Sequence, residues 1–156
     1  MRGVLVNTPD PQQDMVTVTW EERMSPYFAA LRSLVGKTGV RFESRTLKAV
    51  PQAGGVCMFS ALEGPHVCYY VGMSPQDIQY RLQLHWSNYT QSDLSRRIVE
   101  AGKSRDREGA RRWISRNVVV RWLLSDETPM QDAYLEHFLI AVLQPEFNWP
   151  RKRTRS

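Results

Sequence analysis

The sequence predicts an α+β fold in which a small antiparallel β-sheet, of about three strands, is flanked by helices. Two apolar runs rich in β-forming residues, 56–62 and 67–71, are separated by the turn Glu63-Gly64-Pro65 and predict a hairpin. A third run, 118–124, is rich in β-branched residues and predicts a buried strand. Segments with helical periodicity precede, separate and follow these runs.

Capping residues and prolines mark where the helices should begin. A capping-box pattern at Thr19 and Glu22 and a second start at Ser25-Pro26 predict a helix over about 26–36. The other four helices are expected from Ser74-Pro75 toward Trp86, from Ser92 to Gly102, over 106–116, and from Thr128-Pro129 to Pro145.

The length of 156 residues suits one main domain with a core of its own. The Pro- and Gly-rich stretch 51–55 is the best boundary signal. We therefore expect an N-terminal helical extension over 1–54, a main domain over 55–149 and a basic tail over 150–156.

Hydropathy predicts a soluble, cytoplasmic protein without a membrane partner. The longest apolar run, Phe138–Leu143, is too short to span a bilayer, and Asp10 and Asp14 interrupt any signal-peptide core. Cys57 and Cys68 are too few for a disulfide scaffold, so we expect two free thiols.

Positive charge is concentrated in one internal segment. The net charge is +5 and the chain has 17 Arg against 4 Lys, with nine basic and three acidic residues over 96–121. Arginine binds phosphate through a planar, two-pronged group, so this bias indicates a nucleic-acid partner. A GC-rich genome or ordinary solvated helices would produce the same bias.

One carboxylate interrupts an otherwise apolar helix. Between Ala133 and Leu143 only Glu136 and His137 are not apolar or aromatic, so we expect the helix to be largely buried. A buried carboxylate needs a compensating partner. Glu136 is therefore either paired with an arginine or serves as a metal ligand or acid–base group.

Arg81 and His85 are four residues apart and share a face of their predicted helix, beside the apolar Ile78 and Leu82. Their role is open at this point. Arg81 could simply pair with Asp77 along the helix, or both could belong to a site.

Several motifs, in this order, together resemble the GIY-YIG nuclease family. They are Gly55-Val56-Cys57, Tyr70-Val71-Gly72, Arg81 with His85, the lone Glu136, and the segment from Glu136 through Pro145 to Asn148. That last segment looks like the end of the catalytic domain in excision-repair endonucleases of this family. The resemblance covers about 55–148, with 87–117 as a basic insertion. Cys57 stands where the family's first motif has tyrosine, and Met73 where several relatives have lysine.

The resemblance implies a metal-dependent DNA endonuclease that hydrolyses phosphodiester bonds. It implies that Tyr70 is the general base, that Arg81 binds the phosphate, and that His85 transfers a proton or orients water. It implies that Glu136 is the ligand of Mg²⁺ (or Mn²⁺). Asn148 would brace the site through side-chain hydrogen bonds, with Cys57 and Gly72 as supporting residues. Restoring tyrosine at position 57 should then leave activity unchanged or raise it.

Strand alternation allows the Tyr70 assignment to be checked. Alternation puts Cys68, Tyr70 and Gly72 on one face of their strand, with Tyr69 and Val71 on the other. Forming phenolate at pH 7 from a group with a pKa near 10 costs roughly 4 kcal/mol. A cation about 4 Å away in a partly shielded site offsets about that much.

The basic segment supplies candidate phosphate contacts outside the motifs: Arg105, Arg107, Arg111, Arg112 and Arg116. A chain of this size suggests a stand-alone enzyme of restriction, phage or mobile-element type, which could form a homodimer for double-strand cleavage. The alternatives are a nucleic-acid-binding module with weakened chemistry, a structure-specific repair nuclease, and an unrelated α+β interaction domain.

Overall fold

The computed structural model describes residues 18–148 and has an α+β architecture with one four-stranded antiparallel sheet in the order β1-β4-β2-β3. The strands are β1 (Val40–Arg41), β2 (Gly55–Ala61), β3 (Gly64–Ser74) and β4 (Val118–Leu124). The helices are α1 (Trp20–Gly36), α2 (Ser44–Leu47), α3 (Ile78–Ser87), α4 (Asp93–Glu100), α5 (Arg107–Asn117) and α6 (Asp132–Leu143), with a 3₁₀ turn over Ser125–Glu127.

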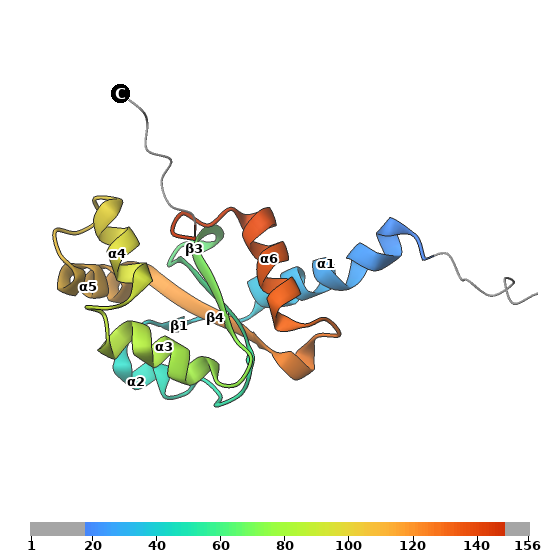
Figure 1. Cartoon of the computed structure of the whole chain (residues 1–156), viewed down its shortest axis with the longest axis horizontal. Helices are drawn as coiled ribbons and strands as arrows, with labels where there is room; N and C mark the ends of the chain where they lie inside the picture. The colour runs from blue at the N-terminus through green and yellow to red at the C-terminus, as the bar shows by residue number, and fades with distance from the viewer. Residues whose placement is uncertain (1–17, 149–156) are drawn as a thin grey trace, which may run out of the picture.

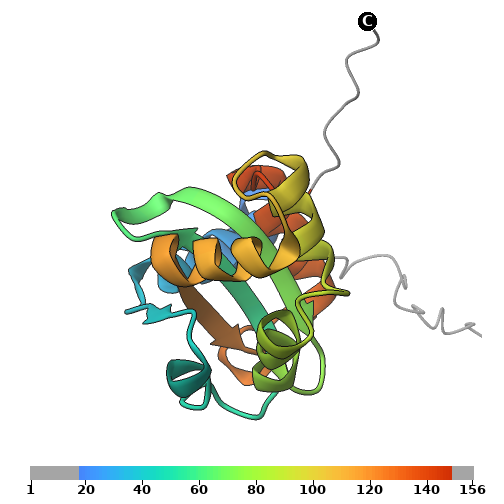
Figure 2. The ribbon, with the colours of Figure 1, turned by 90° about the vertical axis from the view of Figure 1, so that its left-hand side faces the viewer.

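The sheet lies between two layers of helices. Figure 1 shows α1 and α6 on one side of the strands and α2 to α5 on the other, and Figure 2 views the molecule from the second side. The predicted α+β class, with a small antiparallel sheet flanked by helices, is confirmed. The sheet has a fourth strand because β1 pairs with β4 through only two residues, which is too short for any hydropathy pattern to mark.

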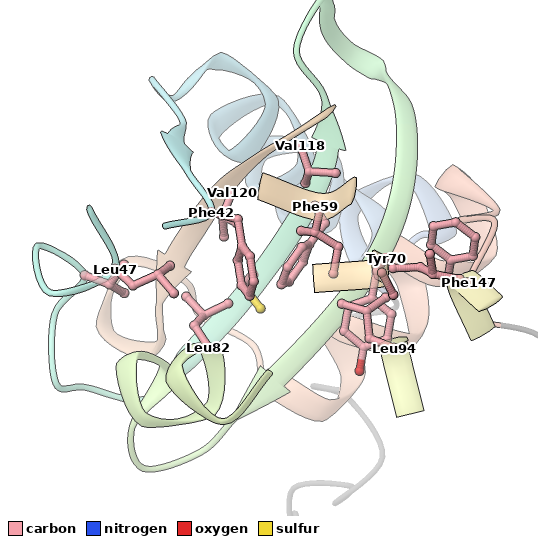
Figure 3. Close-up of a cluster of buried hydrophobic side chains, with 14 of the residues drawn as sticks. Phe42, Leu47, Phe59, Tyr70, Leu82, Leu94, Val118, Val120 and Phe147 are labelled. Atoms are coloured by element: carbon pink, nitrogen blue, oxygen red, sulfur yellow. The ribbon is translucent and has the colours of Figure 1, made fainter. Parts of the chain in front are cut away.

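Side-chain alternation along β2 divides the interior into two cores. Cys57 and Phe59 point toward α2 to α5, whereas Val56 and Met58 point toward α1 and α6. Figure 3 shows the first core, in which Phe59 lies beside Phe42. All seven residues of β2 are buried, as expected for a central strand covered on both faces.

The predicted hairpin is confirmed, with one change at its turn. Ala61 pairs with Gly64, so Leu62 and Glu63 form the turn and Gly64 already belongs to β3. The predicted helix start at Ser92 is also confirmed, and Gly102 follows α4 with φ of +74°.

Three predicted helix starts are wrong. The capping box of Thr19 starts α1, and Pro26 lies inside that helix. Asp77 caps α3, while the Ser74 hydroxyl accepts a hydrogen bond from the Asp77 amide in the preceding turn. Helix α6 begins only after Gln131. At Ser74-Pro75 and Thr128-Pro129 the pair precedes the helix, because such pairs also fit turns, whereas at Ser25-Pro26 the helix has already begun after Thr19.

Helix α6 is less buried than its composition predicts. Only Leu135 and Leu139 are buried, whereas Tyr134 is 59% and Val142 46% exposed. The helix packs against the sheet and α1 along one face, and its other face carries apolar residues into solvent.

The N-terminal segment and the basic segment both contribute to the cores. Ala30 and Leu34 of α1 pack with α6, and β1 extends the sheet. Helices α4 and α5, expected as an insertion, bury Ile98 and Ile114 in the first core. The predicted tail 150–156 lies outside the described residues. Within 18–148, no helix combines the length and apolar character needed to cross a bilayer.

Candidate active site

A β-bulge in β3 determines which side chains reach the candidate site. Phe59 pairs with Tyr70 but the next residue of β2, Ser60, pairs with Cys68, so Tyr69 is an extra residue in β3. Tyr69 and Tyr70 therefore both lie on the side of the first core, and Cys68 lies on the opposite side. The predicted alternation is correct for Tyr70 and wrong for Cys68 and Tyr69, because a bulge reverses the alternation beyond it.

The outer edge of β3 is closed by residues from the C-terminal part of the chain. The Asn148 side chain accepts a hydrogen bond from the Val71 amide and donates one to the Val71 carbonyl, both at 2.7 Å. The Phe147 amide donates to the Tyr69 carbonyl at 2.8 Å. Asn148 thus has the bracing side-chain hydrogen bonds expected of it, and it holds β3 in place beside Tyr70.

A hollow of about 280 Å³ opens over this part of β3 and α3. The predicted residues Tyr70, Arg81 and His85 all line it. The rest of its lining was not anticipated and comes from α3 and the start of α4: Leu84, Asn88, Gln91, Ser92 and Asp93. Of these, only Ser92 gave a sequence signal, as the cap of α4.

Tyr70 and Arg81 are in direct contact. The Arg81 Nη2 donates to the Tyr70 hydroxyl at 3.3 Å. Burial raises the pKa of Tyr70, and the charge of Arg81 opposes this without cancelling it. A side chain at Gly72 would place its Cβ 2.9 Å from the Tyr70 ring, so glycine permits the ring to approach the strand. Because its pKa is raised above the ordinary value of 10, Tyr70 is neutral at pH 7 when neither DNA nor metal is bound.

Glu136 lies beside this pair on α6. Burial raises the pKa of its carboxyl group, and the charge of Arg81 and a hydrogen bond from the Met73 amide partly offset the increase. Within residues 18–148, no basic side chain approaches the Glu136 carboxylate within 4.0 Å. The simple ion pair considered from the sequence is therefore not formed. Glu136 does not line the hollow, and it is linked to the other predicted residues through the charge of Arg81.

His85 completes the cluster. Its Nδ1 lies 2.8 Å from the Ser92 Oγ, and its ring contacts the rings of Phe59 and Tyr70 edge to face. Burial and the nearby charge of Arg81 lower the pKa of His85 from 6.5 to about 4. His85 is therefore neutral at pH 7.

The lowered pKa of His85 predicts a loss of stability in mild acid. The unfolded chain takes up a proton near pH 6.5 and the folded chain only near pH 4, so the free energy of unfolding should fall between these values by about 3 kcal/mol at most. Urea denaturation at intervals from pH 7 to 4 measures this. His85→Gln should show a shallower fall, and His66→Gln, which removes a histidine from an exposed position, is the control. If the free energy of unfolding falls equally steeply with pH in the two variants, the lowered pKa of His85 is contradicted.

Cys57 is enclosed in the first core. Its exposed fraction is 1%, its Sγ donates to the Gly72 carbonyl at 3.5 Å, and burial raises its pKa to about 12. Cys57 and Cys68 are free thiols, as expected. Neither is a thiolate at neutral pH.

The burial of Cys57 changes the expectation for Cys57→Tyr. A tyrosine adds a ring to a closed position, and such overpacking costs about 1–3 kcal/mol of unfolding free energy. We expect a lower urea midpoint and lower activity, with Cys57→Ser as the size-matched control. Unchanged stability in Cys57→Tyr would show that the core around Cys57 accepts the ring.

The arginines of the basic segment fall into two groups. Arg107 donates to the Thr90 carbonyl, and the Arg111 guanidinium lies 4.4 Å from the ring centre of Tyr89, so both pack against the segment that follows α3 beside the hollow. Arg112 pairs with Glu108 at 2.8 Å on the exposed face of α5. Arg105 and Arg116 are exposed.

Comparisons with known proteins do not identify the chain: no family model, curated protein or solved structure matches it. Nor does any group of three or more His, Cys, Asp or Glu side chains in the described part of the chain form a ready-made metal site. Any assignment of function therefore rests on the chemistry of the residues themselves.

Proposed function

We propose that this chain is a metal-dependent DNA endonuclease that hydrolyses phosphodiester bonds, of the kind found in GIY-YIG nucleases. The observation that carries the proposal is that a tyrosine of β3 meets an arginine and a histidine of α3 at one hollow. A carboxylate of α6 lies near enough for the charge of the arginine to act on it. Arg81 shifts the pKa of Tyr70, His85 and Glu136 alike, so the four groups share one electrostatic environment.

Each residue has a chemical role in the proposed reaction. Tyr70 first releases its hydroxyl proton to solvent, and the resulting phenolate, stabilised by the charge of Arg81, accepts a proton from the attacking water. Arg81 also places positive charge beside the phosphate. His85 orients the reacting groups. Asn148 and Gly72 keep Tyr70 in position through β3.

The carboxylate of Glu136 fits a divalent cation that is held jointly with the substrate. Mg²⁺ retains several waters and is commonly held by one or two carboxylates together with substrate phosphates, so a single glutamate suffices. When bound, the ion supplies positive charge that stabilises the leaving oxygen. Because the protein offers few ligands, we expect cation binding to be weak without DNA.

A supercoiled plasmid tests the proposal. We expect nicking by the full chain with Mg²⁺ or Mn²⁺ and none with EDTA. Sequencing the ends of products from duplex, single-stranded and branched DNA then separates the stand-alone, restriction-like role from a repair-type role. The absence of cleavage on every substrate would refute the nuclease proposal.

A DNA-binding module with weakened chemistry is the second candidate. Two observations favour it: Cys57 replaces the motif tyrosine, and burial raises the pKa of Tyr70. Such a module would bind the same DNA substrates in a gel-shift assay without cutting them.

The exposed arginines of α5 are expected to contact phosphates. Replacing both Arg112 and Arg116 with Ala should reduce the slope of log K against log salt by about two, because each duplex phosphate contact contributes about 0.9. Arg23→Ala with Arg32→Ala removes the same charge from α1, on the opposite layer, and should leave the slope unchanged. An unchanged slope in the α5 variant would move the DNA contact away from this helix.

A further inference from the structure

The two ring nitrogens of His85 have different surroundings. The Nδ1 atom lies 2.8 Å from the Ser92 hydroxyl, whereas the Nε2 atom is buried and has no hydrogen-bond partner among the described residues. A neutral imidazole carries its proton on one nitrogen only, so the position of that proton decides whether His85 is a donor or an acceptor at Nε2.

The hydrogen bonds of Ser92 favour one position for the proton. Ser92 caps α4, and its Oγ accepts a hydrogen bond from the Ser95 amide. The hydroxyl has one proton of its own to donate, and the Nδ1 of His85 is in line to accept it. If Nδ1 carried the proton instead, two donors would point at the Ser92 oxygen and its hydroxyl proton would lack this acceptor.

We propose that Ser92 holds His85 as the neutral tautomer protonated at Nε2, so that His85 acts as a fixed hydrogen-bond donor toward an oxygen of the substrate and not as a base. The role of His85 in this inference rests on the proposed function, whereas the tautomer is a property of the folded chain. Ser92 is then a positioning residue that lies outside every motif of the sequence.

The groups around His85 agree with a neutral donor. Tyr70 of β3 faces its ring, Arg81 lies one turn earlier on α3, and Asp93 lies at the start of α4. The charge of Arg81 opposes protonation of the ring more strongly than Asp93 favours it. An unpartnered buried N–H is costly, and an anionic oxygen entering the hollow would satisfy it.

Imidazole nitrogen-15 shifts of the labelled full chain at pH 7 test the tautomer directly, because protonated and unprotonated nitrogens resonate far apart. His85→Gln identifies the signals among the three histidines. We expect Nε2 to be protonated and Nδ1 unprotonated. A proton on Nδ1 would overturn the proposal.

Variants of Ser92 test whether it sets the tautomer. Ser92→Gly removes the hydroxyl with little loss of helix capping, so the two shifts of His85 should move toward each other as the tautomers mix. Ser92→Thr should preserve the wild-type shifts. Asp106→Ala removes the equivalent cap of α5 without touching His85 and should also leave them unchanged. Wild-type shifts in Ser92→Gly would refute the role of Ser92.

Plasmid cleavage separates a donor from a base. Glutamine can donate through its amide but cannot take up a proton at neutral pH, so His85→Gln should cleave at least tenfold faster than His85→Ala. Equal losses in the two variants would overturn the donor role. A wild-type chain without cleavage would refute the proposed function, while the nitrogen shifts would still decide the tautomer.

Discussion

Glu136→Gln is expected to reduce DNA cleavage by about 10³-fold or more while the protein stays folded and binds DNA. The carboxylate is the proposed metal ligand, and the charge that a metal ion places in the transition state is worth several kcal/mol. Burial raises the pKa of Glu136, so the neutral glutamine should fit the same position without loss of stability. Cleavage rates, urea midpoints and gel shifts of the purified variant measure its activity, its stability and its DNA binding, respectively.

Asp132→Asn is the matched control for Glu136→Gln. Asp132 lies one turn earlier on α6 and is hydrogen-bonded to Ser125, so its replacement removes the same charge from the same helix outside the proposed chemistry. We expect cleavage close to wild type. Activity of Glu136→Gln within tenfold of wild type would show that Glu136 is not the metal ligand.

Tyr70→Phe is expected to lower the cleavage rate by at least about 10²-fold, the usual scale for loss of a general base. The ring contacts with Phe59 and His85 remain, and only the hydroxyl that accepts the hydrogen bond from Arg81 is lost. Single-turnover rates at saturating enzyme separate this effect from weaker DNA binding.

Tyr69→Phe provides the control for Tyr70→Phe. Tyr69 is the neighbouring residue in β3, and its ring packs against Trp113 and Phe147 away from the hollow. Cleavage should be nearly unchanged. Equal effects at the two positions would mean that the hydroxyl of Tyr70 has no special role.

Much of the fold could be predicted because its signals are local. The alternation in β2, the β-branched run of β4 and the cap at Ser92 each lie within a few residues of the element that they define. Strand β1 could not be predicted, because its pairing with β4 is a contact between distant segments. The bulge at Tyr69 was missed for a similar reason, since the Phe147 amide of the distant C-terminal segment donates a backbone hydrogen bond to that residue.

In the candidate site, too, contacts between distant segments could not be predicted. Tyr70, Arg81, His85 and Glu136 were selected through the resemblance to GIY-YIG nucleases. The structure brings the first three together, and the charge of Arg81 reaches Glu136. The contact of Ser92 with His85 and that of Met73 with Glu136 were not foreseen, because each joins two separate elements. The burial of Cys57 could be predicted, because a small thiol on a continuous apolar strand is typical of a core position, and it is confirmed.

A double-mutant cycle on plasmid nicking tests the central claim that Tyr70 and Glu136 serve one active site. The rates of wild type, Tyr70→Phe, Glu136→Gln and the double variant are compared with Mg²⁺ present. If the two residues act in the same step, the second substitution causes little further loss of rate once the first is made. The double variant should therefore be about as slow as the slower single variant. A wild type that does not nick DNA, or losses that multiply in the double variant, would contradict the account.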